Sequence, residues 1–590
     1  MSAGEASSPS GRSADASNDV LRVRDLRTEV ATPEGSRVVV DGLSFDLAAG
    51  RTLCIAGESG SGKSMTALSI MRLLPEPMAR VGGGSIRLAG RELLTLSETE
   101  MRRVRGGDVA MIFQEPMTSL NPVLSIGRQL VEAIRAHPPL DRSAAREAAV
   151  DALEAVRISE PQRRLGQYPH ELSGGMRQRV MIAMALAGRP KVLIADEPTT
   201  ALDVTVQAEI LDLIRTLQAE YGTALLLITH DMGVVAEMAD HVIVMKDGGM
   251  VESGGVEQIF AAPENTYTQA LLAAVPRLGA MAGKPQPAGR TQSSPVLRVR
   301  DLAVRFDIKG GIFQRTRTQV RAVRDISFSI AAGETFALVG ESGCGKSTTA
   351  KALLGLVPWE GEIEVAGQET HGLGARAMKA VRRNIQMVFQ DPYASLDPRM
   401  RVGDLVAEPL IIHGVATGSA ARDRVAELFR RVGMTPEQMS MHPHEFSGGQ
   451  RQRICIARAL ALSPKIIVAD ESVSALDVSV QARVLDRMRK LQEELGISYL
   501  FISHDMAVVE QISHRVAVMY RGEIVEMGTR GQVFETPRHP YTQRLLDAVP
   551  IPDPTRRRAR NARAAWQGEG VEEGRHMLHD LGEGHLVAAA

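Results

Sequence analysis

The 590-residue chain is long enough to bury more than one core, and its charges nearly cancel, with 69 Lys and Arg against 70 Asp and Glu. A net charge of −1 offers no broad basic field to phosphates, so we expect no nucleic acid partner. The three cysteines lie far apart, which indicates a reducing compartment without disulfides or a metal cluster.

The beginning of the chain, residues 1–19, is rich in Ser and Ala and lacks an apolar core, which predicts a disordered leader and not a signal peptide. A first domain is predicted at 20–262. Its run TLCIAG at 52–57 is typical of a buried parallel strand that enters a phosphate-binding loop. No stretch of about 18 consecutive apolar residues occurs, so we do not expect the chain to span a membrane by itself.

Phosphate-binding loops are predicted twice, at GESGSGKS (57–64) and GESGCGKS (340–347). Their glycines let backbone N–H groups surround phosphates, the lysine contacts the β and γ phosphates, and the hydroxyl ligates Mg²⁺. A chance Gly-rich turn could explain one copy but not two. Cys344, inside the second loop, is expected to be exposed when no nucleotide is bound. The residues predicted to bind ATP here are Gly57, Gly60, Gly62, Lys63, Ser64, Gly340, Gly343, Gly345, Lys346 and Ser347.

Each loop is followed by an apolar strand that ends in two carboxylates, VLIADE and then IIVADE. Buried carboxylates need a cation or a water to act on, because an unpaired buried charge is costly. Asp196 and Asp470 are therefore expected to hold Mg²⁺, while Glu197 and Glu471 act as general bases toward the attacking water. Acids that simply face solvent are the alternative for either pair taken alone.

Single histidines, His230 and His504, end the next strands at the same spacing from the acidic pairs. A packed histidine is the commoner interpretation of one such residue, but the repetition favours contact with the γ-phosphate. Gln114 and Gln390 are candidate site residues only because each lies between the phosphate-binding loop and the acidic pair in both halves. The segments LSGGMRQR and FSGGQRQR predict a second anion site at a helix start, with a plain helix N-cap as the alternative; the residues concerned are Ser173, Gly174, Gly175, Ser447, Gly448 and Gly449.

The remaining segments complete the predicted organisation. An extension is expected at 263–281, a Gly- and Pro-rich linker at 282–295, a second domain at 296–537, a second extension at 538–553 and a tail at 554–590. The tail contains RRRAR at 556–560, which favours a solvated charge run over contact with anionic lipid.

The ordered motifs resemble the ATP-binding cassette family over nearly the whole chain. The resemblance implies an α/β fold of two tandem P-loop ATP-binding cassettes, each with a helical subdomain, that pair within one chain. ATP and Mg²⁺ would lie between the loop, Gln, acidic pair and His of one cassette and the SGG segment of the other. Family metal ligands map to Ser64, Gln114, Asp196, Ser347, Gln390 and Asp470.

Two departures from the family pattern stand out. The first SGG segment continues with Met176 in place of the usual Gln. The aromatic residue that the family stacks on adenine corresponds to Phe306 in the second half, but to Val30 in the first. We therefore expect weaker adenine binding at the first loop, and hydrolysis at both sites because each keeps its Glu and His.

The extensions, ENTYTQALLAAVPRLGAM and HPYTQRLLDAVP, resemble those of importer ATPases for dipeptides, oligopeptides and nickel. VRGGDVAMIFQEPMTSLNP and similar segments resemble the fused two-cassette subunits of bacterial glutathione importers. The resemblance implies an ATPase at the cytoplasmic face of the bacterial inner membrane that does not touch the solute. Its partners would be two membrane-spanning permease subunits and a periplasmic solute-binding protein.

Two other functions stay open. The first is ATP hydrolysis for an importer of dipeptides, oligopeptides or nickel. The more remote one is a soluble twin-cassette ATPase associated with ribosomes, which the short linker with few charges does not favour.

Overall fold

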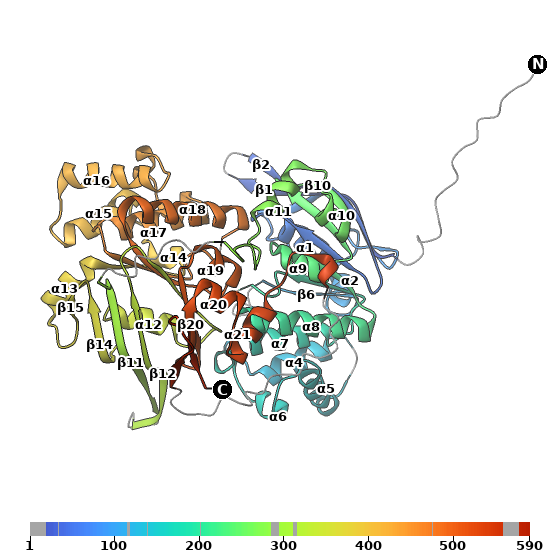
Figure 1. Ribbon diagram of the computed structural model, residues 1–590. Helices are drawn as coiled ribbons and strands as arrows, with labels where there is room; N and C mark the ends of the chain where they lie inside the picture. Colours follow the sequence, from blue (N-terminus) through green and yellow to red (C-terminus); the bar gives the residue numbers. More distant parts are fainter. Residues whose placement is uncertain are drawn as a thin grey trace, which may run out of the picture. The chain divides into compact units, whose positions relative to one another are not determined.

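The computed structural model describes residues 19–32, 35–114, 119–137, 140–200, 202–284, 294–310, 315–474, 476–557 and 577–589. The chain divides into two compact units (Figure 1). Unit 1 comprises Met1–Thr200, Glu209–Leu272 and Pro552–Arg557, and unit 2 comprises Ala201–Ala208, Ala273–Ile551 and Arg558–Ala590. Residues 1–18 of the leader predicted at 1–19, and residues 285–293 of the linker predicted at 282–295, lie outside the described residues.

Unit 1 contains an antiparallel sheet in the order β2-β1-β4-β5. Strands β1 and β2 form a long hairpin, and β1 also pairs with β4. Apolar residues on the inward face of β1 are fully buried, as expected for a sheet that covers a core with one side. The strands are β1 (Asp19–Thr32), β2 (Gly35–Ala48), β4 (Ala79–Leu88) and β5 (Arg91–Glu92).

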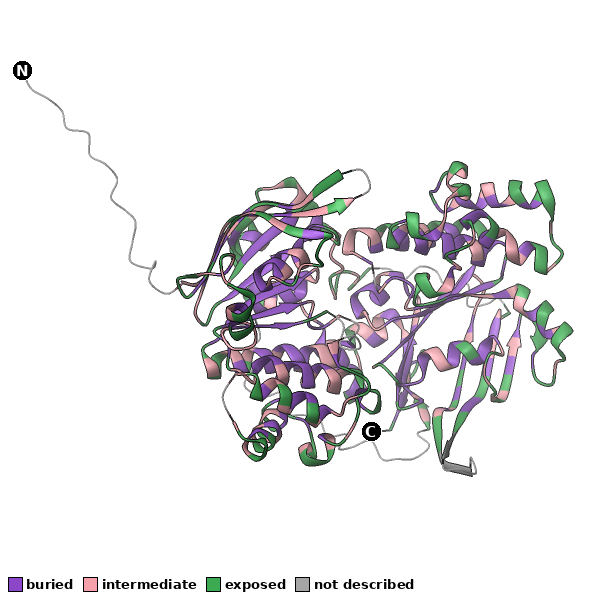
Figure 2. Ribbon diagram, turned by 180° about the vertical axis from the view of Figure 1, so that it is seen from behind, coloured by how far each residue is buried: buried purple, intermediate pink, exposed green. Residues whose placement is uncertain are grey.

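A second sheet of unit 1 has the order β10-β9-β3-β8-β7-β6. Its central strands β3, β7 and β8 are parallel and every residue in them is buried, which explains their continuous apolar sequences (Figure 2). The strands are β3 (Thr52–Ala56), β6 (Val109–Ile112), β7 (Val192–Asp196), β8 (Ala224–Thr229), β9 (His241–Lys246) and β10 (Gly249–Gly255).

The helices of unit 1, which holds most of α8 and of α11, alternate with these strands, follow β6 as a helical insert or follow β10. Several begin at side chains that cap the helix, such as Ser125, Asp141 and Asp231. The helices are α1 (Lys63–Met71), α2 (Glu98–Val104), α4 (Ile126–Arg135), α5 (Arg142–Ala155), α6 (Pro161–Arg164), α7 (Gly174–Leu186), α8 (Val204–Tyr221), α9 (Met232–Met238), α10 (Val256–Ala261) and α11 (Thr266–Ala274).

Unit 2 repeats both sheets. The antiparallel sheet has the order β12-β11-β14-β15, and the mainly parallel one runs β16-β17-β18-β13-β19-β20-β22-β21. The strands are β11 (Leu297–Gly310), β12 (Arg315–Ile330), β13 (Thr335–Val339), β14 (Glu360–Val365), β15 (Gln368–Glu369), β16 (Ile385–Val388), β17 (Ile466–Asp470), β18 (Ser498–Ile502), β19 (Arg515–Tyr520), β20 (Glu523–Thr529), β21 (Leu578–Asp580) and β22 (Leu586–Ala588).

The helices of unit 2 follow the same order. Between β16 and β17 lies a helical insert that includes α15 and α16, as in unit 1. The helices are α12 (Lys346–Leu353), α13 (Ala375–Asn384), α14 (Pro392–Ser395), α15 (Val402–Ile412), α16 (Gly418–Arg431), α17 (Gly448–Leu460), α18 (Val478–Leu495), α19 (Met506–Ile512), α20 (Arg530–Glu535) and α21 (Pro540–Ala548). The predicted α/β class with a helical subdomain in each half is confirmed.

The last described residues extend the parallel sheet of unit 2. Strand β22 pairs with β20, and His585 Nε2 lies 2.8 Å from an oxygen of the fully buried Glu526. The same carboxylate accepts the backbone N–H groups of Arg538 at 2.8 Å and His539 at 3.0 Å. A buried carboxylate with this many partners anchors both the end of the chain and the start of α21 to β20.

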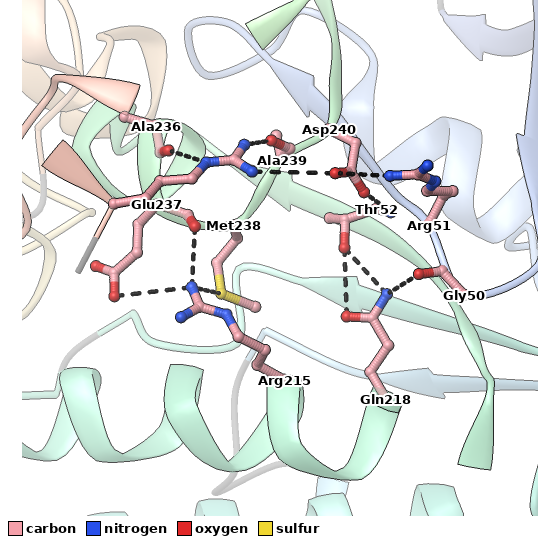
Figure 3. Close-up of polar contacts among 11 residues, drawn as sticks. Gly50, Arg51, Thr52, Arg215, Gln218, Ala236, Glu237, Met238, Ala239 and Asp240 are labelled. Carbon is pink, nitrogen blue, oxygen red and sulfur yellow. Dashed lines mark hydrogen bonds and ion pairs between the residues drawn. The ribbon is translucent and has the colours of Figure 1, made fainter. Parts of the chain in front are cut away.

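Arg557 takes part in the packing of unit 1. Its guanidinium donates to the carbonyl of Ala236 at 3.3 Å and to that of Ala239, and lies 4.0 Å from Asp240 Oδ1 (Figure 3). Carbonyls at the end of a helix such as α9 carry partial negative charge, so a cation is favourable there. Arg557 is thus hydrogen-bonded to the end of α9 while it stays exposed, as expected for a solvated charge, and Arg558–Arg560 lie outside the described residues.

Among the residues that the structure describes, no helix is long and apolar enough to cross a bilayer.

A pH dependence is expected from one position that differs between the units. Asp240 accepts the N–H of Thr52 at 2.9 Å, whereas His514 Nδ1 accepts that of Thr335 at 3.1 Å. Burial lowers the pKa of His514 from its ordinary 6.5. Below pH 6.5 the unfolded chain takes up a proton here that the folded unit does not, so stability should fall as the pH drops from 6.5 toward the folded pKa.

His514→Asn should weaken this pH dependence because asparagine keeps an acceptor and does not titrate. Thermal unfolding of the full chain at about pH 5.5 and about pH 7.5 measures it. His371→Asn, at an exposed position, is the control. Equal pH dependence in the His514 variant and the unmodified protein would contradict the assignment.

Candidate active sites

The first phosphate-binding loop connects β3 to α1. Gly57 has φ of +149°, and a Cβ at this position would lie 2.3 Å from the carbonyl oxygen of Met245. Only glycine therefore lets the chain turn here. The ammonium of Lys63, the first residue of α1, donates to the carbonyls of Gly57 and Glu58, both at 2.8 Å. The loop thus holds its cation at the start of a helix, where anions are favoured.

Asp196 ends β7 beside this loop. Its Oδ1 accepts a hydrogen bond from Ser64 Oγ at 3.1 Å, so the two predicted metal ligands are adjacent. Burial raises the pKa of Asp196 to about 6, the bond from Ser64 opposes this, and the charge of Glu197 adds to it. A hard divalent cation would stabilise the ionised form, and two oxygen ligands of this kind suit Mg²⁺.

Glu197 follows with a backbone φ of +48°, in the left-handed region that non-glycine residues rarely adopt. Its N–H donates to the carbonyl of Ile228 at 2.8 Å, which holds the turn. The carboxylate accepts hydrogen bonds from Gln114 Nε2 and Thr200 Oγ1 and lies next to His230 Nδ1, each at 2.9 Å. The strained backbone aims this carboxylate at the ends of the two neighbouring strands.

Hydrogen bonding and burial act in opposite directions on Glu197. Burial raises the pKa of its carboxyl, but the hydrogen bond and charge of His230 and the bond from Thr200 outweigh it and lower the pKa overall. Glu197 is therefore ionised at neutral pH, as a general base must be.

Unit 2 builds the same arrangement. Lys346 Nζ donates to the carbonyls of Gly340 and Glu341 at 2.8 Å, and Ser347 Oγ donates to Asp470 Oδ1 at 3.0 Å. Glu471 has φ of +45°, and its carboxylate accepts from Gln390 Nε2 at 2.6 Å and lies 3.5 Å from His504 Nδ1. One contact differs, because Ser474 Oγ donates to the backbone carbonyl of Glu471, not to its carboxylate.

The electrostatics of the second site follow those of the first. Burial raises the pKa of Asp470, opposed by the hydrogen bond from Ser347. Burial also raises the pKa of Glu471, but its bond and charge pairing with His504 lower the pKa overall. Burial lowers the pKa of His504, and the pairing with Glu471 outweighs it, so the histidine pKa is raised.

A cavity of about 170 Å³ lies over the second loop within unit 2. Its walls are polar, and they include most of the residues predicted to handle nucleotide in this half. The lining residues are Leu202, Asp203, Ser342, Gly343, Gly345, Lys346, Ser347, Thr348, Gln390, Glu471 and His504.

The expectation of an exposed Cys344 is wrong. Its side chain is 6% exposed, and burial raises the pKa of the thiol. Gly340 approaches its sulfur closely, because a Cβ built on that glycine would lie 2.9 Å from Cys344 Sγ. The loop turns this side chain inward, so the thiolate that reacts with electrophiles is disfavoured.

Comparison with known proteins agrees with this geometry. A family model described as "ABC transporter" matches residues 40–200 and 323–474, and one described as "Oligopeptide/dipeptide transporter, C-terminal region" matches 251–296 and 525–570. The chain belongs to the ABC transporter family. The predictions of two ABC cassettes, of ATP binding and of an ATPase are thereby confirmed.

Curated relatives match almost end to end. "Glutathione import ATP-binding protein GsiA" of Salmonella paratyphi A (strain ATCC 9150 / SARB42) is 54% identical over 97% of this chain and 97% of its own length. The protein of the same name from Escherichia coli (strain K12) is 53% identical with the same coverage. A solved structure of the ATP-binding cassette MJ0796 bound to ADP and Pi has 26% identity, covers 40% of this chain and 98% of its own, and has a TM-score of 0.36.

The ABC signature segments begin helices in both units. Ser173 caps α7 by accepting the N–H of Met176 at 3.3 Å, and Ser447 caps α17 by accepting that of Gln450 at 3.4 Å. In α17 the Gln450 side chain also accepts the N–H of Ser447 at 3.0 Å, which completes a reciprocal capping box. These hydrogen bonds hold each serine at the start of its own helix.

The position predicted to stack on adenine is equivalent in the two hairpins. Val30 lies two residues beyond Thr28, which pairs with Val40, and Phe306 lies two residues beyond Val304, which pairs with Val323. Phe306 is 40% exposed and free to present its ring at the surface. The difference between Val30 and Phe306 is therefore a real difference between matching positions.

Three residues that contact the catalytic-glutamate candidate or a phosphate-binding loop were not predicted from the sequence. Thr200 donates to the Glu197 carboxylate, and two tyrosines of the extensions, Tyr267 and Tyr541, reach the phosphate loops. The repeated Tyr-Thr-Gln of both extensions was the available signal, since these three letters occur at the same place in each half.

Met176→Gln is expected to stabilise the chain because glutamine can accept the N–H of Ser173 as Gln450 does for Ser447. A gain of about 0.5–1 kcal/mol in the free energy of unfolding is the usual value of such a cap. Gln450→Met should produce the opposite change. Denaturant unfolding of the full chain measures both, and a destabilised Met176 variant would contradict the assignment.

Val30→Tyr should tighten ATP binding at the first loop by about 1 kcal/mol, because an aromatic ring can stack on adenine. Phe306→Val should weaken the second loop by a similar amount. Each is measured by nucleotide titration in a background where the opposite loop is disabled by Lys346→Ala or Lys63→Ala. Unchanged affinity in the Val30 variant would show that this position does not meet adenine.

Proposed function

We propose that this protein is the ATP-hydrolysing motor subunit of a bacterial importer for glutathione. The near end-to-end identity of 54% to a protein named for glutathione import carries the proposal. The duplicated acid, histidine and glutamine networks support it, because each unit retains the groups that hydrolysis requires.

The proposed chemistry uses the ionised Glu197 and Glu471 as general bases. Each carboxylate would take a proton from the attacking water, and its histidine and glutamine partners hold it in one orientation before nucleotide arrives. Lys63 and Lys346 would exchange loop carbonyls for phosphate oxygens, since each ammonium is already at the centre of its loop. His230 and His504 would contact the γ-phosphate.

The residues around each acidic pair fit Mg²⁺. The hydroxyl of Ser64 and the carboxylate of Asp196 are adjacent oxygen donors, and Ser347 and Asp470 repeat them. Burial disfavours the charge on both aspartates, which a cation would relieve. Gln114 and Gln390 are proposed as further ligands, and Mg²⁺ when bound would neutralise charge on the β and γ phosphates.

Two membrane-spanning permease subunits and a periplasmic solute-binding protein are proposed as partners. The protein would lie at the cytoplasmic face of the inner membrane and would not touch the solute. The described part of the chain offers no membrane-crossing helix, which is compatible with a peripheral subunit that acts through permeases.

A second candidate is ATP hydrolysis for a dipeptide or oligopeptide importer. The matched "Oligopeptide/dipeptide transporter, C-terminal region" favours it, since this region occurs after each cassette.

Glutathione uptake by cells tests the proposal. Deletion of the gene should abolish ATP-dependent uptake of labelled glutathione, and the Glu197→Gln plus Glu471→Gln variant should fail to restore it. Glutamine keeps the size of the side chain and one acceptor oxygen but cannot take a proton, so hydrolysis should fall by about 10²-fold or more, as expected for loss of a general base. Nucleotide binding should persist.

The conservative Asp486→Asn variant, at an exposed position of α18, is the matched control and should restore uptake. Intact glutathione uptake in the deletion strain would reject this solute. Loss of dipeptide uptake in the same strain would then support the second candidate.

A further inference from the structure

The extension after each cassette contacts the phosphate-binding loop of the same unit through one tyrosine hydroxyl. Tyr267 in α11 accepts the backbone N–H of Glu58 at 3.3 Å, and Tyr541 in α21 accepts that of Glu341 at 3.1 Å. Glu58 and Glu341 directly follow the first glycine of their loops. The same contact therefore occurs in both units, at the same position of the loop.

The contacted residue is also the one that holds the loop lysine. The carbonyl of Glu58 accepts from Lys63 Nζ at 2.8 Å, and the carbonyl of Glu341 accepts from Lys346 Nζ at the same distance. Each tyrosine therefore accepts a hydrogen bond from the backbone N–H of a glutamate, and the carbonyl of the same glutamate accepts one from the loop lysine. Rotation of that glutamate would disturb both hydrogen bonds together.

A carboxylate of the sheet anchors each tyrosine helix; Glu526 is fully buried, whereas Glu252 is partly exposed. Glu252 in β10 accepts the N–H of Glu264 at 2.8 Å and that of Asn265 at 3.2 Å, just before α11. Glu526 in β20 does the same for Arg538 and His539 before α21. The hydroxyl is therefore presented to the loop from a helix whose start is held by the same sheet that carries the loop.

The next turn-forming contacts also match. Asn265 Oδ1 accepts the N–H of Tyr267 at 2.8 Å, and His539 Nδ1 accepts that of Tyr541 at 3.1 Å. In both sequences, Asn-Thr-Tyr and His-Pro-Tyr, the side chain two residues before the tyrosine accepts the backbone N–H of the tyrosine.

The surroundings of the two rings differ. Tyr541 is fully buried and its ring centroid lies 4.5 Å from that of Tyr520, whereas Tyr267 is half-buried and has Lys246 Nζ 5.0 Å from its centroid. The tilted ring of Tyr520 packs against the buried Tyr541, whereas Tyr267 has a cation beside a partly exposed ring. The hydrogen bond of Tyr541 is also the shorter of the two.

We propose that Tyr267 and Tyr541 are positioning residues that hold each phosphate-binding loop in its ATP-binding conformation. Neither touches the reacting atoms; each acts through the backbone of Glu58 or Glu341 and so sets the affinity for nucleotide. The extensions are by this account part of the ATP sites. The inference rests on ATP binding within the proposed function and is independent of which solute is imported.

Tyr541→Phe and Tyr267→Phe test it, because phenylalanine retains the ring packing and removes only the hydroxyl. Each variant is made in the full chain with the opposite loop disabled by Lys63→Ala or Lys346→Ala. Loss of one hydrogen bond should raise the Kd for ATP by about 2- to 10-fold, more for Tyr541 than for Tyr267. The rate of hydrolysis at saturating ATP should change less than twofold, since the catalytic carboxylate is unaffected.

Tyr499→Phe is the matched control. Its hydroxyl is also buried and donates to the carbonyl of Met488 at 3.2 Å, but it does not contact the loop. This variant should lower the unfolding temperature comparably while leaving the Kd for ATP unchanged. An equal effect of Tyr499→Phe and Tyr541→Phe on the Kd, or no effect of Tyr541→Phe on it, would overturn the proposal.

The same assay separates this inference from the proposed function. If the unmodified protein hydrolyses ATP and the tyrosine variants bind it normally, only the inference fails. If the unmodified protein neither binds nor hydrolyses ATP, the proposed function fails as well.

Discussion

The hydrogen-bonded carboxylate after β7, and its counterpart after β17, is the constraint on which each site depends. Glu197 joins three strand ends, because its partners Gln114 and His230 follow β6 and β8 on either side of β7. Parallel strands place their carboxyl ends at one edge of a sheet, so residues distant in sequence meet there. The fully apolar strands and the helices that cover them serve to hold this edge fixed while one backbone residue stays in a left-handed conformation.

Burial gives the two acids of each pair different properties. Burial raises the pKa of Asp196, which accepts a hydrogen bond from the hydroxyl of Ser64. The pKa of Glu197 is lowered by His230, so this carboxylate stays ionised. One carboxylate is therefore suited to a cation and the other to a proton, although they are neighbours in the chain. In the second unit the pKa of Asp470 is likewise raised and that of Glu471 lowered, so the difference between the two acids comes from the shared fold.

The two units share the acid, glutamine and histidine residues of each site but differ in the residues around them. The second glutamate lacks the carboxylate contact that Thr200 provides in the first, and only the second signature helix has a reciprocal capping box. Such differences alter loop order and helix stability around identical reacting groups. Physically, such differences permit two sites of unequal affinity for nucleotide. The varied pairs of residues are Val30 and Phe306, Met176 and Gln450, Thr200 and Ser474, and Asp240 and His514.

The fold class, the duplication, and the loop, acid, glutamine and histidine residues that meet in each unit could be predicted from the amino-acid sequence, because these predictions depend on local patterns repeated in one order. The sequence could not determine the inward turn of Cys344, the docking of Arg557 on α9, or the reach of Tyr267 and Tyr541 to the loops. Those depend on which side of a turn a side chain takes and on contacts between residues hundreds of positions apart. Local propensity carries no information about such distances, so only tertiary packing decided them.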